Sequence, residues 1–443
     1  MTTPETSEKA ADKNDKTPPL PPPVDVISQT SHSVVINGET VNYQATAGRL
    51  ILKAEDEKTG EKPKAAIFFV AYTRDRPTDA SEAGYVAARP ITFAFNGGPG
   101  SSSVWLHLGL LGPRRVVLEE DGRPLPPPYR LVNNDYSLLD KTDLVFIDPV
   151  TTGFSRAVPG EADKQFHGFK PDIESVGEFI RLYLSRNHRW ASPRYLIGES
   201  YGTTRAAGLA GHLQERHGLY LNGIMLISVV LNFMTLHFAP GNDLPYMLFL
   251  PTYAATAHYH GRLGPDAPAE LPALLAEVEA FAMNEYALAL LRGDALPAEE
   301  RAAIAGRLAR YTGLPADYIL RTNLRINIHR FTKELLRDRR RTTGRLDSRY
   351  TGIDRDAAGE YDEFDPSYAL IQGPYTGLLN DYVRRELRFE SDLPYEILSD
   401  RVQPWSFDDH QNTYVNVGET LRQAMSMNPH LRVFVANGYY DLA

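Results

Sequence analysis

The residues best suited to chemistry in this sequence are 198–202, which read Gly-Glu-Ser-Tyr-Gly. An apolar run at 195–197 precedes them, and small and apolar residues with helical spacing follow: Ala206, Leu209, Ala210 and Leu213. This pattern predicts a strand, a tight turn with Ser200 at its tip and a helix, which together would present a serine hydroxyl as a nucleophile. The glycines let backbone pack against backbone where a Cβ would clash. An ordinary turn is the alternative, because the five-residue pattern also recurs by chance.

A second glycine-rich turn lies upstream at residues 96–102, directly after an apolar run that ends at Phe95. It reads Asn-Gly-Gly-Pro-Gly-Ser-Ser, and its glycines would let main-chain N–H groups approach a substrate oxygen. With the N–H of Tyr201 it would form an oxyanion hole, which stabilises charge developing on a carbonyl oxygen. A glycine-rich turn that binds nothing is the alternative. A phosphate-binding loop is disfavoured because the lysine of such loops is missing.

Strands alternate with helices around both turns, which predicts an α/β fold with a mostly parallel central sheet. An Asn-Gly pair at positions 37 and 38 predicts a hairpin between antiparallel strands before that sheet. Helical spacing predicts helices over 170–185 and 417–427. The other expected strands are 41–44, 51–54, 65–72, 91–95, 143–148, 195–197, 224–230 and 431–436.

From residue 234 to residue 372 the alternation stops, and apolar spacing around 274–282 and 304–311 indicates amphipathic helices. We expect a helical cap over the active edge of the sheet, where substrate selection usually resides. An arginine-rich run within it, 337–349, is interpreted as a solvated helix face with a loop, and binding of an acidic substrate group is the alternative. The expected domains are a disordered proline-rich tail (1–24), the first part of the α/β core (25–233), the cap (234–372) and the returning core (373–443).

Composition excludes several classes of protein. A net charge of −9 argues against nucleic-acid binding, and no apolar stretch reaches membrane-spanning length. The chain has no cysteine, which excludes disulfides, thiolate nucleophiles and cysteine-based metal sites, and no metal or cofactor is predicted. The N-terminus lacks the features of a secretory signal, so we expect a cytoplasmic location, or a periplasmic or secreted one if a leader precedes this sequence. The sequence does not predict the oligomeric state.

Four motifs resemble, in order, those of the serine carboxypeptidases, peptidase family S10. Residues 96–102 resemble the signature N-G-G-P-G-C-S-S, and 198–202 resemble the family's G-E-S-Y-A/G turn. Residues 148–155 are similar to the stretch D-x-P-x-G-x-G-F-S, and 438–441 (Gly-Tyr-Tyr-Asp) to the G-D-x-D loop that carries the acid. The resemblance runs from about residue 90 to the C-terminus and is loosest across the cap. It implies a bacterial-type member with an α/β-hydrolase fold that removes C-terminal residues from peptides.

The resemblance also implies a role for each matching residue. These are the nucleophile (Ser200), the acid that orients a histidine (Asp441), the oxyanion donors (Gly98, Tyr201) and the residues that bind the terminal carboxylate of a peptide (Asn96, Glu199). Two carboxylates bind each other well only while one keeps a proton. Peptide hydrolysis is therefore expected to be favoured at mildly acidic pH, with KM rising as Glu199 ionises. A structural hydrogen-bonding role is the alternative for Glu199.

Two departures from the family pattern stand out. Ser101 occupies the position of the signature's cysteine, so the disulfides of many relatives are absent. The histidine of an α/β-hydrolase follows the acid, yet only two residues follow Asp441. Neither His107 nor His410 is predicted to be the base. We expect the last strand, the catalytic histidine and the closing helix to lie beyond Ala443, and the 443-residue form to be inactive without them.

Two other functions stay open. An esterase or acyltransferase would use the same nucleophile, although Asn96 and Glu199 favour peptides because they serve no obvious purpose for a neutral ester. A non-catalytic protein would keep the pocket without a base. The preferred C-terminal side chains are not predicted, since they depend on the placement of cap residues.

Overall fold

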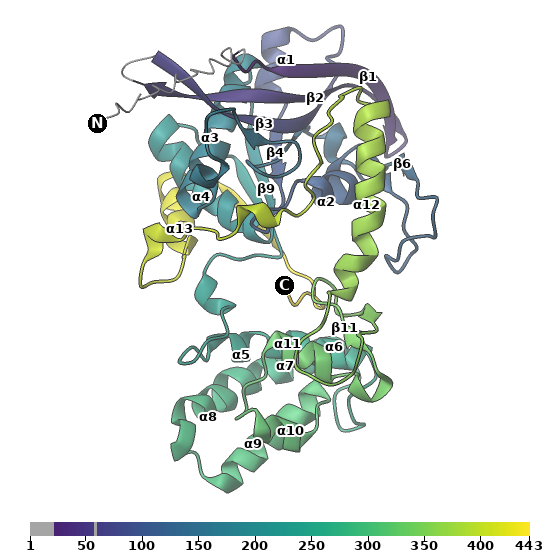
Figure 1. Cartoon of the computed structure of the whole chain (residues 1–443), viewed down its shortest axis with the longest axis vertical. Coiled ribbons are helices and arrows are strands. Elements are labelled where there is room, and N and C mark those ends of the chain that lie inside the picture. Colours follow the sequence, from purple (N-terminus) through teal and green to yellow (C-terminus); the bar gives the residue numbers. More distant parts are fainter. Residues whose placement is uncertain (1–21, 57–59) are drawn as a thin grey trace, which may run out of the picture.

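The computed structural model describes residues 22–56 and 60–443. The proline-rich tail expected at 1–24 therefore lies almost entirely outside the described residues. Figure 1 shows an α/β region built on a long twisted sheet and, at the opposite end of the molecule, a group of helices. The C-terminus lies between these two parts (Figure 1).

Within the described residues, nine strands form one sheet in the order β1-β2-β3-β7-β4-β9-β10-β13, and β8 pairs with β3 at its side. Strands β7, β4, β9, β10 and β13 are parallel, whereas β1, β2 and β3 pair antiparallel and join the rest through β3 and β7. The strand bounds are β1 Val26–Ile36, β2 Glu39–Asp56, β3 Gly60–Arg74, β4 Ile91–Phe95, β7 Asp143–Ile147, β8 Arg156–Ala157, β9 Arg194–Glu199, β10 Gly223–Ile227 and β13 Arg432–Ala436. A small separate ribbon pairs β5 (Arg114–Val116) with β6 (Leu131–Asn133).

The expected hairpin at Asn37 and Gly38 is present, but the next strand is longer than predicted. The sequence predicts separate strands at 41–44 and 51–54, and β2 runs through both without a break. Gly48 explains the continuity: a Cβ there would lie 2.5 Å from the carbonyl oxygen of Val26. The glycine therefore lets β1 pair closely with β2 at this point, and β2 continues through it.

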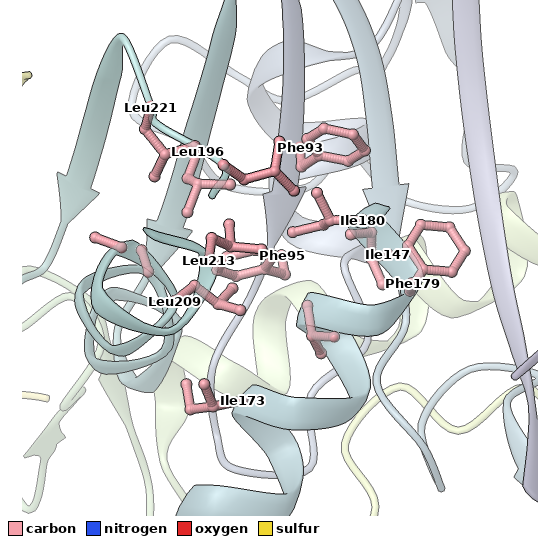
Figure 2. Packing of buried hydrophobic residues seen from close by; sticks show 14 of the residues in the cluster. Phe93, Phe95, Ile147, Ile173, Phe179, Ile180, Leu196, Leu209, Leu213 and Leu221 are labelled. Atoms are coloured by element: carbon pink, nitrogen blue, oxygen red, sulfur yellow. The ribbon is translucent and has the colours of Figure 1, made fainter. Parts of the chain in front are cut away.

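Two apolar layers cover the sheet. On one face, α3 (Phe169–Arg186), α4 (Tyr201–His217) and α13 (Gly418–Met427) pack on β4, β7 and β9, as Figure 2 shows for Phe93, Phe95 and Leu196. On the other face, α2 (Val104–Leu106) and α12 (Pro366–Arg385) pack on side chains of β3 and β7. Every residue of β4 and β7 is buried, which is the pattern of strands covered on both sides. Helix α1 (Glu82–Ala88) has no buried residue.

The helical insertion has an apolar core of its own, which includes Tyr253, Val278, Leu308 and Phe331. Leu442, next to the C-terminus, is fully buried in this core. The elements are α5 Leu244–Leu248, α6 Leu250–Tyr259, α7 Leu271–Phe281, α8 Ala287–Arg292, α9 Ala298–Thr312, α10 Ala316–Arg321, α11 Ile328–Glu334, β11 Thr342–Thr343 and β12 Thr351–Gly352.

Two expectations for the insertion differ from the structure. The expected boundary at residue 372 falls inside α12, which runs through Pro374 because Tyr375, Leu379 and Val383 beyond it are buried against the sheet. Figure 1 shows α12 reaching from the insertion to the sheet. The arginine-rich run at 337–349 is mostly not helical either: one 3-10 turn is followed by β11 and a loop. Pairing of β11 with β12 holds this segment extended.

None of the helices that the structure describes combines the length and the apolar character that crossing a bilayer would require.

Candidate active site

Ser200 stands at a strained corner between β9 and α4. Its backbone has φ 55° and ψ −127°, a conformation that residues other than glycine rarely adopt. The surrounding backbone enforces it, because the N–H of Ser200 donates to the carbonyl of Ile227 in β10 at 3.0 Å. At Gly198 a Cβ would lie 2.1 Å from the carbonyl oxygen of Gly202. The corner therefore depends on glycine on both sides, and Ser200 itself stays partly exposed.

The glycine-rich turn after β4 lies directly against this corner, since β4 and β9 are neighbours in the sheet. A Cβ on Gly97 would lie 2.4 Å from the backbone nitrogen of Tyr201. Gly98 has φ 102°, which favours glycine. The turn's main chain thus meets the first N–H of α4 beside the serine, the arrangement that oxyanion stabilisation needs.

Asn96, which begins the glycine-rich turn, and Glu199, which precedes Ser200 in the sequence, contact each other directly. The Asn96 amide nitrogen donates to Glu199 Oε2 at 2.9 Å, and its amide oxygen accepts from the N–H of Leu106 at 3.0 Å. Asn96 is fully buried, so its amide is fixed in this orientation. Burial raises the pKa of Glu199, and the hydrogen bond from Asn96 opposes that rise only in part. Glu199 therefore keeps its proton to a higher pH than an ordinary glutamate.

Asp441 follows β13, the strand that pairs with β10 beside the serine corner. Its Oδ1 accepts from the N–H of Ala443 at 2.9 Å. Burial raises the pKa of Asp441, and hydrogen bonding to the hydroxyl of Ser228 lowers it in part. The negative charge of Asp441 also contributes to the raised pKa of Glu199, so the two carboxyls lie within electrostatic range of each other.

Comparison with known proteins shows which proteins this segment of the chain is similar to. The family model described as serine carboxypeptidase (Peptidase_S10) matches residues 57–234, which hold the glycine-rich turn and Ser200. This segment is therefore similar to the serine carboxypeptidases. The pheromone-processing carboxypeptidase KEX1 of Saccharomyces cerevisiae is 34% identical over 168 residues, which are 36% of this chain and 21% of that protein. Serine carboxypeptidase-like 36 of Arabidopsis thaliana is 32% identical over 148 residues, 32% of this chain and 29% of its own length.

A solved structure extends the likeness beyond the matched segment. The crystal structure of Kex1, a prohormone-processing carboxypeptidase from Saccharomyces cerevisiae, superposes with a TM-score of 0.53 at 18% identity. The superposition covers 90% of this chain and 74% of that one. The predicted α/β-hydrolase fold is thereby confirmed. The sequence matches, by contrast, span only 21% to 29% of the lengths of the two curated relatives.

A buried arginine that the motifs did not reveal connects the glycine-rich turn after β4 with the helix that follows Ser200. Arg205 of α4 donates from Nε to Asp172 Oδ2 of α3 at 2.8 Å and from Nη1 to the carbonyl oxygen of Asn96 at 2.7 Å. Its side chain is 1% exposed, and its guanidinium lies 5.3 Å from the ring centres of Phe95 and Tyr201. A charged residue on the apolar face of the helix after the serine was the signal that could have identified it.

The other family motifs support the oxyanion turn from outside. Asp148 Oδ1 accepts from the N–H of Ser103 at 2.8 Å, just past that turn. Ser101, in place of the signature's cysteine, donates to the carbonyl oxygen of Ser102 at 2.9 Å and accepts from the indole of Trp105 at 3.1 Å. Where relatives carry a cysteine, this chain uses hydrogen bonds within the turn.

Within the described residues, no histidine forms a hydrogen bond with Ser200 or Asp441. His107 is buried in the sheet core, where its ring bonds to the hydroxyl of Tyr72 at 2.6 Å and burial lowers its pKa to about 3. The ring of His410 packs against the ring of Phe169, with 5.3 Å between the ring centres. The histidine expected beyond Ala443 stays a prediction.

A cavity of about 190 Å³ lies beside the acid. It is lined on one side by Ser228, Gly438 and Asp441, and on the other by residues 346, 347 and 349 of the insertion. The insertion therefore contributes to the wall next to Asp441. Among the residues that the structure describes, no group of three or more histidine, aspartate or glutamate side chains is placed to hold a metal ion.

Proposed function

We propose that this protein is a serine-type carboxypeptidase that releases C-terminal residues from peptides through an acyl-enzyme on Ser200. The observation that carries the proposal is the contact between two backbone turns, with Gly97 against the nitrogen of Tyr201. Attack by the Ser200 hydroxyl on a carbonyl carbon would place the developing oxyanion at the N–H groups of Gly98 and Tyr201. Asp441 would orient a histidine that takes the serine proton and returns it to the leaving amine.

Recognition of the peptide's end falls to Glu199 and Asn96. A glutamate with a raised pKa can donate a hydrogen bond to a substrate carboxylate instead of repelling it. Asn96 holds that carboxyl in place from behind. This pair favours a peptidase over an esterase or acyltransferase, because a neutral ester offers no carboxylate for it.

The subtype and the location are part of the same proposal. We infer a bacterial-type member because the chain has no cysteine and replaces the signature's cysteine with Ser101. The proposed location is cytoplasmic, and a periplasmic or secreted location is the alternative. Peptides with a free C-terminal carboxylate are the proposed partners.

Two peptides that differ only at the C-terminus test the function. The full-length gene product is given one peptide with a free carboxylate and the same peptide as its C-terminal amide, and kcat/KM is measured for both. We expect the free acid to be hydrolysed at least about 100-fold faster, because the amide leaves the buried polar groups unpaired. Equal rates, or a faster reaction with a matched ester than with either peptide, would replace the peptidase with an esterase.

A further inference from the structure

The arginine-rich segment of the insertion is fastened to the loop that carries Asp441. The N–H of Leu442 donates to the carbonyl oxygen of Arg345 at 2.9 Å, and the N–H of Ser348 donates to the carbonyl oxygen of Tyr440 at 2.9 Å. These backbone bonds bracket Asp441 on both sides. A segment of the insertion is thereby held next to the proposed acid, although the two lie about 100 residues apart in the sequence.

Arg345 is the arginine of this run whose backbone is bonded to the loop of Asp441, and its charge is only weakly engaged. Its side chain is 46% exposed, and its single ion pair is with Asp365 Oδ2 at 4.0 Å, too long for a hydrogen bond. Asp365 is already engaged, because it caps α12 by accepting from the N–H and hydroxyl of Ser367 and from the N–H of Arg345 itself. Within the described residues, the guanidinium of Arg345 forms no hydrogen bond.

Arg349, four residues later, shows the opposite state. It binds Asp347 through two nitrogens, at 2.6 and 3.0 Å, and stacks on the ring of Tyr440 at 5.1 Å. Its charge is neutralised within the fold. Unlike Arg349, Arg345 has N–H groups that are free to donate hydrogen bonds to a carboxylate from outside the protein.

The charge of Arg345 acts on the proposed active site. It lowers the pKa of both Glu199 and Asp441, against the larger effect of burial, so the guanidinium lies within electrostatic range of both carboxyls. The cavity beside Asp441 is lined by Ser228 and by residues 346, 347 and 349, which follow Arg345 in the sequence. A peptide whose scissile carbonyl faces Ser200 would place a neighbouring side chain in this region.

We propose that Arg345 binds an acidic side chain next to the scissile bond, so that preferred substrates carry aspartate or glutamate as their last or next-to-last residue. The inference rests on the proposed carboxypeptidase function and names its substrate class. Glu199 and Asn96 take the terminal carboxylate in that function, which leaves Arg345 for a carboxylate on a side chain. A guanidinium binds a carboxylate through two parallel hydrogen bonds, so an exposed arginine whose guanidinium forms no hydrogen bond within the described residues suits this role.

Two pairs of peptides test the proposal. One pair differs only in having glutamate or glutamine as the last residue, and the other pair differs in the same way at the next-to-last residue, so the comparison shows which position is recognised. In the full-length protein we expect kcat/KM to be roughly 10- to 100-fold higher for glutamate than for glutamine in one of the pairs, the effect of a charged hydrogen bond. Arg345→Gln should bring the ratio of kcat/KM between the glutamate and glutamine peptides close to 1. Arg341→Gln is the matched control: it removes the same charge from an exposed arginine of the same run and should keep the preference.

Binding to the Ser200→Ala variant separates this proposal from the proposed function. If that variant binds the glutamate peptide more tightly and loses the difference with Arg345→Gln, the inference holds even where the wild-type protein hydrolyses nothing and the carboxypeptidase function fails. If neutral peptides are hydrolysed but glutamate gives no advantage in rate or affinity, the function stands and the inference is overturned. A preference that survives Arg345→Gln overturns it as well.

Discussion

The sheet around Ser200 and the helical insertion both contribute to the proposed site, but they are held by different kinds of contact. Around the serine, backbone meets backbone with no room for a Cβ, and the buried pair of Arg205 and Asp172 fixes α4, α3 and the oxyanion turn. The insertion contacts the loop of Asp441 through two backbone hydrogen bonds, the burial of Leu442 in its apolar core and the stacking of Arg349 on Tyr440. Atoms that take part in bond making are thus rigidly placed, whereas the residue proposed to select substrates sits where substitution disturbs little else.

The sharpest test of this contrast compares a buried ion pair of the sheet region with an exposed one of the insertion. Arg205→Met should lower the free energy of unfolding by about 3–5 kcal/mol, because it leaves the buried carboxylate of Asp172 without a partner. Arg321→Met breaks an ion pair with Asp317 on α10 in which both side chains are largely exposed, and should leave stability unchanged. Denaturant unfolding measures both. Equal losses would show that the two regions are not held differently.

The pH dependence of stability should also differ between the regions. Burial raises the pKa of Asp148 to about 6, so ionising it costs free energy in the fold. Its contribution to the free energy of unfolding is complete below about pH 4 and falls by about 3 kcal/mol as pH rises through 6. Asp148→Asn should remove that fall, as denaturant unfolding from pH 4 to pH 8 will show.

Asp354 in the insertion should make the free energy of unfolding change with pH in the opposite direction. Burial opposes its ionisation, but hydrogen bonds from Lys333 and Thr342 outweigh burial and hold its pKa below the usual range. Its contribution is therefore present at neutral pH and is lost only as pH falls below about 4. Asp354→Asn should destabilise the protein by a constant amount between pH 5 and pH 8. A loss that grows with pH over this range would contradict the assignment.

Alanine substitutions at one glycine of each region should differ less in the free energy of unfolding than the ion-pair variants do, but they should differ clearly in the labelling of Ser200. Gly198→Ala forces a Cβ to 2.1 Å from backbone and should cost about 1–3 kcal/mol, displacing the serine corner so that a fluorophosphonate no longer labels Ser200. Gly306→Ala, on an exposed face of α9 with no atom within 4 Å of the new Cβ, should instead stabilise the protein by about 0.5–1 kcal/mol and leave labelling unchanged. Unfolding curves and labelled-peptide mass spectrometry measure the two effects.

The two proposed carboxylate-binding groups should differ in their response to pH. Glu199 binds a carboxylate only while protonated, so KM for a neutral-side-chain peptide should rise several-fold as pH increases past its raised pKa. Glu199→Gln keeps a donor at every pH and should flatten that profile. The contact proposed for Arg345 does not require a proton on Glu199, so the advantage of a glutamate peptide should not change over the same range. A flat KM in the wild-type protein would remove Glu199 from this role.

Local patterns predicted the parts of the molecule that local forces build. The strand ending at Phe95, the corner at Ser200 and the α/β order follow from apolar runs and glycine positions, and the structure has them at those positions. Contacts between distant residues explain what the sequence patterns missed. Helix α12 continues through Pro374 because the sheet buries its far end, and β2 continues through Gly48 because β1 pairs with it there. The place of Arg345 depends on hydrogen bonds to residues 440–442, which no local pattern encodes.

Covalent labelling tests the central claim most directly, namely that the hydroxyl of Ser200 faces main-chain donors from the turn after β4. The full-length gene product is treated with a fluorophosphonate, and the modified residue is identified by mass spectrometry. We expect one adduct on Ser200 that is absent from Ser200→Ala and lost on denaturation before treatment. No adduct on Ser200 in the folded protein, or equal labelling of Ser200→Ala, would contradict the account.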